Sequence, residues 1–210
     1  MAHVVNLSES SLFDSPSLFK EMAVLKPNAI AKTQAAMQFI HDNKIPGVLI
    51  GGMAVSHYTH DRPLTPDVDF LTSNLNGLMD LLKKKIHHDS FRPLAPSKDY
   101  NGIYVPSLDA DFLDASGGNA GLNSYIIKTA TTAKIGGATF PIIDPAVLMI
   151  MKFSIGRDKD QTDAFKLIPT LSKSATKTHL QAMKNIHPSV YEDTDAATIW
   201  SYVKAMSKNP

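Results

Sequence analysis

Two acidic segments of the chain alternate polar and apolar residues with the period of a β-strand. In the first segment Asp67 and Asp69 alternate with Val68 and Phe70. Successive side chains of a strand point to opposite faces, so the two carboxylates share one face while the apolar pair points into a core. The pattern therefore predicts a strand that presents paired carboxylates.

The second acidic segment, residues 109–113, has the sequence DADFL and repeats this alternation. Asp109 and Asp111 would project from one face of the strand, and Asp114 from the other. If this strand lies beside the first, it contributes a third carboxylate to the same site. Asp111 is the preferred residue for that position, and Asp109 is the alternative.

The remaining pattern predicts a mixture of strands and helices. An apolar run at 47–50 predicts a strand, Gly51 and Gly52 a turn, and the residues after them a short helix. Apolar residues at helical spacing predict helices at 28–43 and 74–88, and Asp144 and Pro145 are typical of a helix start. Residues 116–123 predict a turn-rich connection, 126–143 a hairpin that turns at 136–137, and 157–163 a charged interhelical loop with internal ion pairs. Two further helices are expected after residue 169, separated at 187–188.

These elements predict an α+β fold with a mixed central β-sheet flanked by helices. We expect an N-terminal arm at 1–27, a main domain at 28–168, and a C-terminal helical extension at 169–210 packed on the same domain. A chain of 210 residues is long enough for one well-packed core.

The amino-acid composition restricts the possible kinds of functional site more than it restricts the possible folds. The chain has no cysteine, which excludes disulfides, thiolate zinc sites and a cysteine nucleophile. Its formal net charge of +1 gives no general attraction to nucleic acid or to membrane surfaces. No apolar run approaches the length of a membrane span, and the sequence predicts a cytoplasmic protein without a membrane partner.

The acidic strand and the glycine turn before it suggest a site for metal and phosphate. Neighbouring carboxylates repel each other, and a hard divalent cation with oxygen ligands relieves this repulsion. Glycines at a helix start permit close approach of a ligand, and exposed amides there favour phosphate, although a Gly-Gly pair is commonly a plain turn. Arg62 could reach a phosphate or be a surface arginine, and Thr65 could order its loop. Lys152 either extends to the surface or reaches an anion.

In its order of motifs the sequence resembles the nucleotidyltransferase superfamily with the DNA polymerase beta-like fold, especially small prokaryotic abortive-infection and toxin–antitoxin members. The resemblance extends over residues 46–167. It rests on the glycine turn, the Asp67–Asp69 strand, the later acid at Asp111, the hairpin, and the segment from Lys152 to Asp163. One departure is that Met53 follows the glycines where relatives often have a small polar residue, so that Ser56 is the nearest hydroxyl.

The resemblance implies a nucleoside triphosphate such as ATP as substrate, with Mg²⁺ or Mn²⁺ as cofactor. The residues that would act on metal and acceptor are Asp67, Asp69 and Asp111. The residues that would bind the triphosphate are Gly51, Gly52, Ser56, Arg62, Thr65 and Lys152.

The implied reaction transfers a nucleoside monophosphate to an acceptor hydroxyl with release of pyrophosphate. The acceptor would be a small molecule, a protein or an RNA such as tRNA. The alternative is a catalytically silent module that acts through protein contacts, for example in a toxin–antitoxin or phage-defence system. A metal-dependent nuclease ranks last, because it gives no role to the glycine turn or to Arg62.

Overall fold

The computed structural model describes residues 27–60, 67–85, 91–94, 101–117, 119–135, 138–195 and 197–201. Arg62 and Thr65, two of the residues expected to bind triphosphate, and the expected hairpin turn at 136–137 lie outside this set. None of the helices in the described ranges is long and apolar enough to cross a membrane.

In the described part of the chain, seven strands form one mixed sheet with the order β3-β4-β5-β2-β1-β7-β6. The strands are β1 (Gly47–Ile50), β2 (Val68–Thr72), β3 (Arg92–Pro93), β4 (Gly102–Val105), β5 (Ala110–Asp114), β6 (Thr131–Ile135) and β7 (Ala138–Ile142). β2 runs antiparallel to β1 and parallel to β5, while β7 joins β1 in parallel. The start of β2, the start of β5 and the end of β1 therefore meet at the same end of the sheet.

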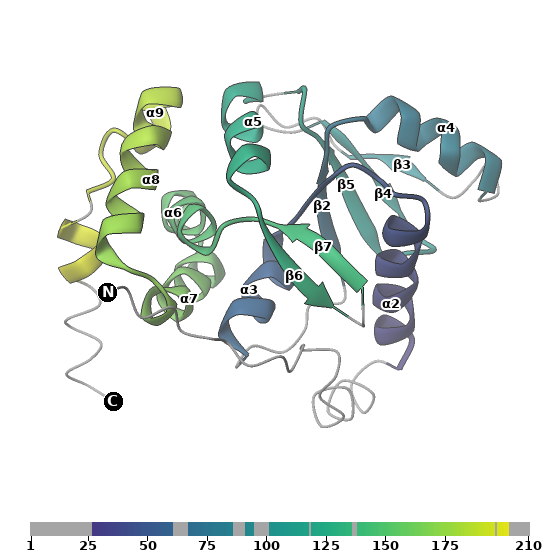
Figure 1. Ribbon diagram of the computed structural model, residues 1–210, viewed down its shortest axis with the longest axis horizontal. Coiled ribbons are helices and arrows are strands. Elements are labelled where there is room, and N and C mark those ends of the chain that lie inside the picture. Colours follow the sequence, from purple (N-terminus) through teal and green to yellow (C-terminus); the bar gives the residue numbers. More distant parts are fainter. Residues whose placement is uncertain are drawn as a thin grey trace.

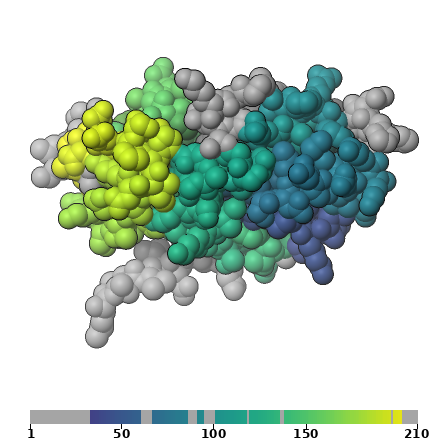
Figure 2. All heavy atoms as spheres, turned by 90° about the horizontal axis from the view of Figure 1, so that it is seen from above, coloured from purple at the N-terminus to yellow at the C-terminus, as the bar shows by residue number. Residues whose placement is uncertain are grey.

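Helices surround this sheet, and those of the C-terminal part form one end of the molecule (Figure 1). They are α2 (Pro27–Asp42), α3 (Gly51–Thr59), α4 (Leu75–Lys85), α5 (Ala120–Thr129), α6 (Pro145–Ile155), α7 (Asp158–Leu167), the 3-10 helix η2 (Ile168–Thr170), α8 (Lys173–Ile186) and α9 (Pro188–Tyr191), and residues 197–201 are also helical. α6 and α7 lie between the sheet and α8, and α4 lies at the far end from α8 and α9 (Figures 1 and 2).

The prediction of an α+β fold with a mixed central sheet and flanking helices is confirmed. Two local predictions are wrong. The expected turn at 116–123 and the first residues of the expected hairpin contain α5, because the Asn119 side chain accepts a hydrogen bond from the Leu122 amide and so caps a helix at Ala120. The hairpin itself is present, as the antiparallel pair of β6 and β7. The segment expected to be a charged loop belongs to α7, whose first turn carries Asp158 and Asp160 where the helix dipole favours acids.

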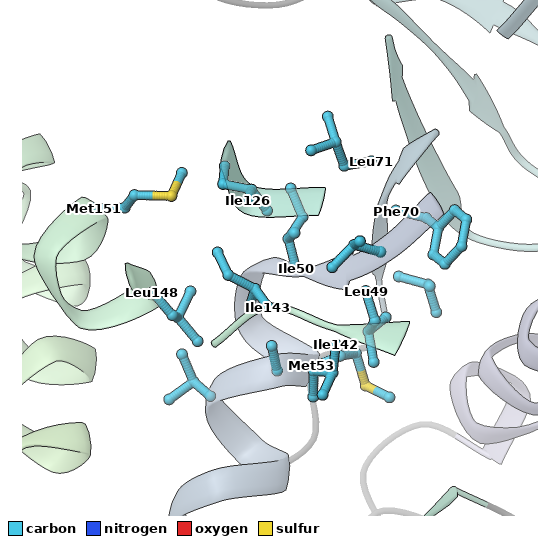
Figure 3. Close-up of a cluster of buried hydrophobic side chains, with 14 of the residues drawn as sticks. Leu49, Ile50, Met53, Phe70, Leu71, Ile126, Ile142, Ile143, Leu148 and Met151 are labelled. Carbon is cyan, nitrogen blue, oxygen red and sulfur yellow. The ribbon is translucent and has the colours of Figure 1, made fainter. Parts of the chain in front are cut away.

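The core forms on both sides of the sheet, because the central strands bear apolar residues on each face. Phe70 of β2 and Phe112 of β5 are fully buried, and their rings meet edge to face with centroids 6.2 Å apart. Figure 3 shows Ile50, Ile126 and Ile143 in one cluster of buried side chains, which also contains Leu148 and Met151 of α6. Packing on both sides of β1 and β2 fixes the end of the sheet where the acidic residues lie.

Candidate active site

Asp69 and Asp111 are direct neighbours across the two parallel strands β2 and β5. The register pairs them with each other, and Val68 with Ala110. Val68 and Ala110 are fully buried, while both carboxylates are half-buried on the opposite face. The alternation in the sequence therefore brings the two carboxylates together, with apolar packing behind them.

Asp67 and Asp109 lie two residues before Asp69 and Asp111, immediately ahead of β2 and β5. Asp67 precedes β2 and is exposed. Asp109 occupies the turn before β5 with a left-handed φ of 50°, and its carboxylate accepts a hydrogen bond of 2.7 Å from the Tyr104 hydroxyl. Of the two residues considered for the third carboxylate, Asp111 is the one that lies across from Asp69.

The electrostatics of the pair show a surplus of negative charge. Burial, followed by the charges of Asp67 and Asp111, raises the pKa of Asp69 from 3.8 to about 6, against the opposing effect of a hydrogen bond from the Gly52 amide. Burial and the charges of Asp67 and Asp109 likewise raise the pKa of Asp111. A cation placed between these carboxylates would therefore be stabilised.

Gly51 makes the approach of α3 to this site possible. β1 ends at Ile50 and α3 begins at the next residue, where Gly51 has a φ of +67°. A Cβ atom on Gly51 would lie 1.8 Å from Oδ2 of Asp69, so no other residue fits there without moving the carboxylate. The first amides of α3 thus lie against the acidic face, where the helix dipole favours an anion.

Ser56 lies in the middle of α3 and is fully buried. Its hydroxyl donates a 3.1 Å hydrogen bond to the Gly52 carbonyl, one turn earlier in the same helix. The Ser56 hydroxyl thus bonds to the backbone of its own helix, while its triphosphate role stays a prediction, as do those of Arg62 and Thr65.

Lys152 belongs to a buried ion cluster that joins α6 to α7. Its ammonium lies 2.6 Å from a carboxylate oxygen of Asp160 and 3.2 Å from one of Asp163, and Arg157 also pairs with Asp160. Lys152 is 7% exposed, Asp160 0% and Asp163 2%, so the cluster is closed to solvent except at Arg157. The Lys152 charge is also near enough to Asp69 to oppose the rise of its pKa. The lysine is thus held by α7 while acting electrostatically on the acidic face.

One internal ion pair of the kind predicted for this segment, Arg157 with Asp160, is present, although the helix that carries it was not predicted. The contact of Asp160 and Asp163 with Lys152 was not predicted from the sequence. Their spacing of three places both on one face of a helix, and that signal becomes visible only once the segment is recognised as α7. Tyr104 was also missed, because its position beside the acids depends on strand pairing.

The residues present fit a magnesium ion that is shared with a substrate. Within the described ranges, no three acidic or imidazole side chains are gathered closely enough to hold a metal by themselves. Mg²⁺ commonly takes one or two carboxylates from a protein and fills its other positions with water and substrate phosphates. Asp69 and Asp111 supply two carboxylates with excess charge, next to helix amides that favour phosphate. This donor set is typical of a site completed by a triphosphate.

Comparison with known proteins gives matches only among solved structures. No protein-family model matches the sequence, and no curated protein sequence matches it. An antigenic nucleotidyltransferase-like protein from Paracoccidioides brasiliensis is 17% identical with a TM-score of 0.48, over 77% of this chain and 88% of that one.

Two further similar structures are of proteins whose names refer to antibiotics. The lincosamide antibiotic adenylyltransferase LnuA is 11% identical with a TM-score of 0.47, over 65% of this chain and 94% of that one. The antibiotic-resistance factor ANT(2'')-Ia is 12% identical with a TM-score of 0.47, over 77% and 92% of the two chains. At such identities a similarity concerns only the arrangement of helices and strands.

Proposed function

We propose that this chain is a metal-dependent nucleotidyltransferase that moves a nucleoside monophosphate from a triphosphate to an acceptor hydroxyl. The observation that carries the proposal is the pairing of Asp69 with Asp111 beside Gly51. It combines carboxylates that need a cation with a helix start that favours phosphate. If Gly51 were only part of a turn, or if the acids only made the strand edge soluble, the start of α3 would not need to approach Asp69 so closely.

In this proposal Asp69 and Asp111, with Asp67 beside them, hold the divalent cation. A magnesium ion bound there supplies positive charge that offsets the charge of the triphosphate. Gly51 lets the phosphates approach the start of α3, while the Gly52 amide already donates a hydrogen bond to Asp69 and positions that carboxylate.

The reaction forms a bond between the acceptor oxygen and the α-phosphorus. The bond from the α-phosphorus to the bridging oxygen breaks, and pyrophosphate leaves with that oxygen. Asp111 takes the hydroxyl proton in this proposal, because it lies across from Asp69 on the same face of the sheet.

Lys152 has a positioning role in this proposal and not a direct contact with phosphate. Its ammonium already pairs with two carboxylates of α7, and from there it limits the negative charge at Asp69. α7 would therefore belong to the architecture of the site without touching the substrate.

The test is incubation of the purified protein with Mg²⁺, each of the four α-labelled ribonucleoside triphosphates and a cell extract, followed by identification of the labelled product. We expect the label to appear in an acceptor with wild-type protein and to disappear with Asp69→Asn or Asp111→Asn. Asp114→Asn is the matched control, because Asp114 lies on the same strand and hydrogen-bonds to Ser116.

Two outcomes would contradict the proposal. Full transfer by either the Asp69 or the Asp111 variant would remove the carboxylates from the mechanism. Absence of magnesium-dependent triphosphate binding by the wild-type protein, measured by calorimetry, would favour the silent module that acts through protein contacts.

A further inference from the structure

The strand pairing that joins Asp69 to Asp111 continues to the edge of the sheet. Asp111 pairs with Tyr104 of β4, and Tyr104 pairs with Arg92 of β3. Residues paired across neighbouring strands project from the same face. Arg92, Tyr104, Asp111 and Asp69 therefore form one row on the face that carries the proposed metal site.

The next row of the sheet shows that this arrangement is not a generally polar surface. It contains Ile103, Phe112 and Phe70, all of which are buried. Because these residues alternate with the polar row, they pack on the opposite face. The polar row of β3, β4 and β5 therefore lies on the opposite face from these packed residues. It is located at the end of the sheet where α3 begins.

Tyr104 and Arg92 offer two different kinds of contact along this row. Tyr104 is half-buried, and its hydroxyl donates to Asp109 at 2.7 Å, which fixes the direction of its ring. Arg92 is exposed and is paired with Tyr104 across β3 and β4, so the two side chains project from the same face of the sheet. A held aromatic ring can stack on a planar group, and a guanidinium pairs well with phosphate.

We infer that Tyr104 and Arg92 form the acceptor side of the site and that the acceptor is a nucleotide unit. Its base stacks on Tyr104, its phosphate pairs with Arg92, and its hydroxyl lies toward Asp111, next in the row. This inference rests on the proposed function. It names a substrate with a planar group and a negative charge.

A nucleotide unit of this kind exists as a free nucleotide or as the end of an RNA chain, and one binding experiment distinguishes the two. The probe is a 5′-fluorescein tetraribonucleotide with a free 3′ hydroxyl, followed by fluorescence anisotropy with Mg²⁺ and an α,β-methylene triphosphate that prevents transfer. Adenosine and cytidine monophosphates are then added as competitors. Competition at concentrations near the oligonucleotide Kd indicates a free nucleotide, and competition only at much higher concentrations indicates an RNA end; both results support the inference.

The variants separate stacking from charge. Tyr104→Leu is expected to weaken oligonucleotide binding about tenfold, while Tyr104→Phe keeps the ring and stays within about twofold of wild type. Arg92→Gln is expected to weaken binding and to reduce the slope of log Kd against log salt by about 0.7, the value for one phosphate contact on a single strand. Lys134→Gln is the control, since Lys134 is an exposed cation on β6 at the opposite edge of the sheet and should leave both quantities unchanged. Thermal unfolding of each variant checks that it is folded.

The inference is overturned if the triphosphate analogue binds to wild-type protein but neither the oligonucleotide nor the monophosphates do. It is also overturned if folded Tyr104→Leu and Arg92→Gln bind the oligonucleotide as wild type does, or if the labelled product from the cell extract is a protein or an amino sugar. In each of these cases the proposed nucleotidyl transfer stands. Failure of the triphosphate analogue itself to bind would instead remove the proposed function, and this inference with it.

Discussion

Replacement of Asp69 by asparagine should make the metal-free protein more stable at neutral pH while it abolishes nucleotidyl transfer. In the folded chain the pKa of Asp69 is raised from 3.8 to about 6, first by burial and then by Asp67 and Asp111. Between these two pH values the folded state binds more protons than the unfolded state. The free energy of unfolding therefore falls as the pH rises from about 4 to about 6, and it stays at the lower value above that range.

The magnitude follows from the size of the shift. A change of roughly two pKa units corresponds to about 2–3 kcal/mol of unfavourable interaction when Asp69 is ionised. Asparagine has nearly the same shape, carries no charge, and keeps an oxygen that can accept the hydrogen bond of the Gly52 amide. Asp69→Asn should thus recover much of this free energy at pH 7.5 and little of it at pH 4.5.

The assay is urea unfolding at pH 4.5, 6 and 7.5 in the presence of EDTA, followed by circular dichroism. Asp80→Asn serves as the control, because the Asp80 side chain is 70% exposed and should change stability little at any of these pH values. Added Mg²⁺ should raise the stability of wild-type protein and have less effect on Asp69→Asn. An Asp69→Asn protein that is less stable than wild type at pH 7.5, or that keeps the wild-type pH dependence, would refute the electrostatic argument.

Three further substitutions test other parts of the site. Lys152→Met should lower the free energy of unfolding, measured by thermal unfolding, by about 3–5 kcal/mol, because Asp163 then loses its ion-pair cation. Adding Asp163→Asn should recover part of this loss, and a loss below about 1 kcal/mol would contradict the buried pair. Gly51→Ala forces a left-handed φ on a residue with a Cβ atom and displaces Asp69, so the free energy of unfolding should fall by about 1–2 kcal/mol from the backbone alone. Triphosphate binding, measured by calorimetry, should also weaken, and unchanged binding would show that the close approach is not needed. Ser56→Ala removes a hydroxyl that bonds within its own helix, so triphosphate Kd should stay within about twofold of wild type, and a larger loss would indicate a direct contact with substrate.

The carboxylate face could be predicted because strand alternation is strict where one face is buried. Val68 and Phe70 are buried in the core, and their burial alone directs the Asp69 side chain to the opposite face of the strand. The glycine pair was recognisable because glycine permits the positive φ and close approach needed where a strand ends, and the structure places Gly51 and Gly52 at the start of α3. The identity of the neighbouring strand was an inference from motif order, and the register of Asp69 with Asp111 came from the structure.

The helices α5 and α7 were missed for different physical reasons. The residues around Ile126 and Ile127 are β-branched and favour a strand locally, but a side-chain cap at Asn119 and packing of Ile126 in the core select a helix. In α7 the high charge suggested a loop, whereas burial of Asp160 against Lys152 stabilises a helix there. The packing of Ile126 and the burial of Asp160 depend on contacts that local propensity does not contain, whereas the Asn119 cap is a local signal.

The raised pKa of Asp69 also has an evolutionary meaning. Mutations that remove a destabilising charge are readily accepted when that charge has no use, since they increase the margin of stability. A lineage released from catalysis would therefore tend to lose Asp69 or Asp111 early, often by a single substitution to a neutral residue. Close relatives of this chain can be sorted on that basis: those that keep both acids beside the glycine turn are expected to be enzymes, and those that have lost either acid while keeping the fold are expected to be silent.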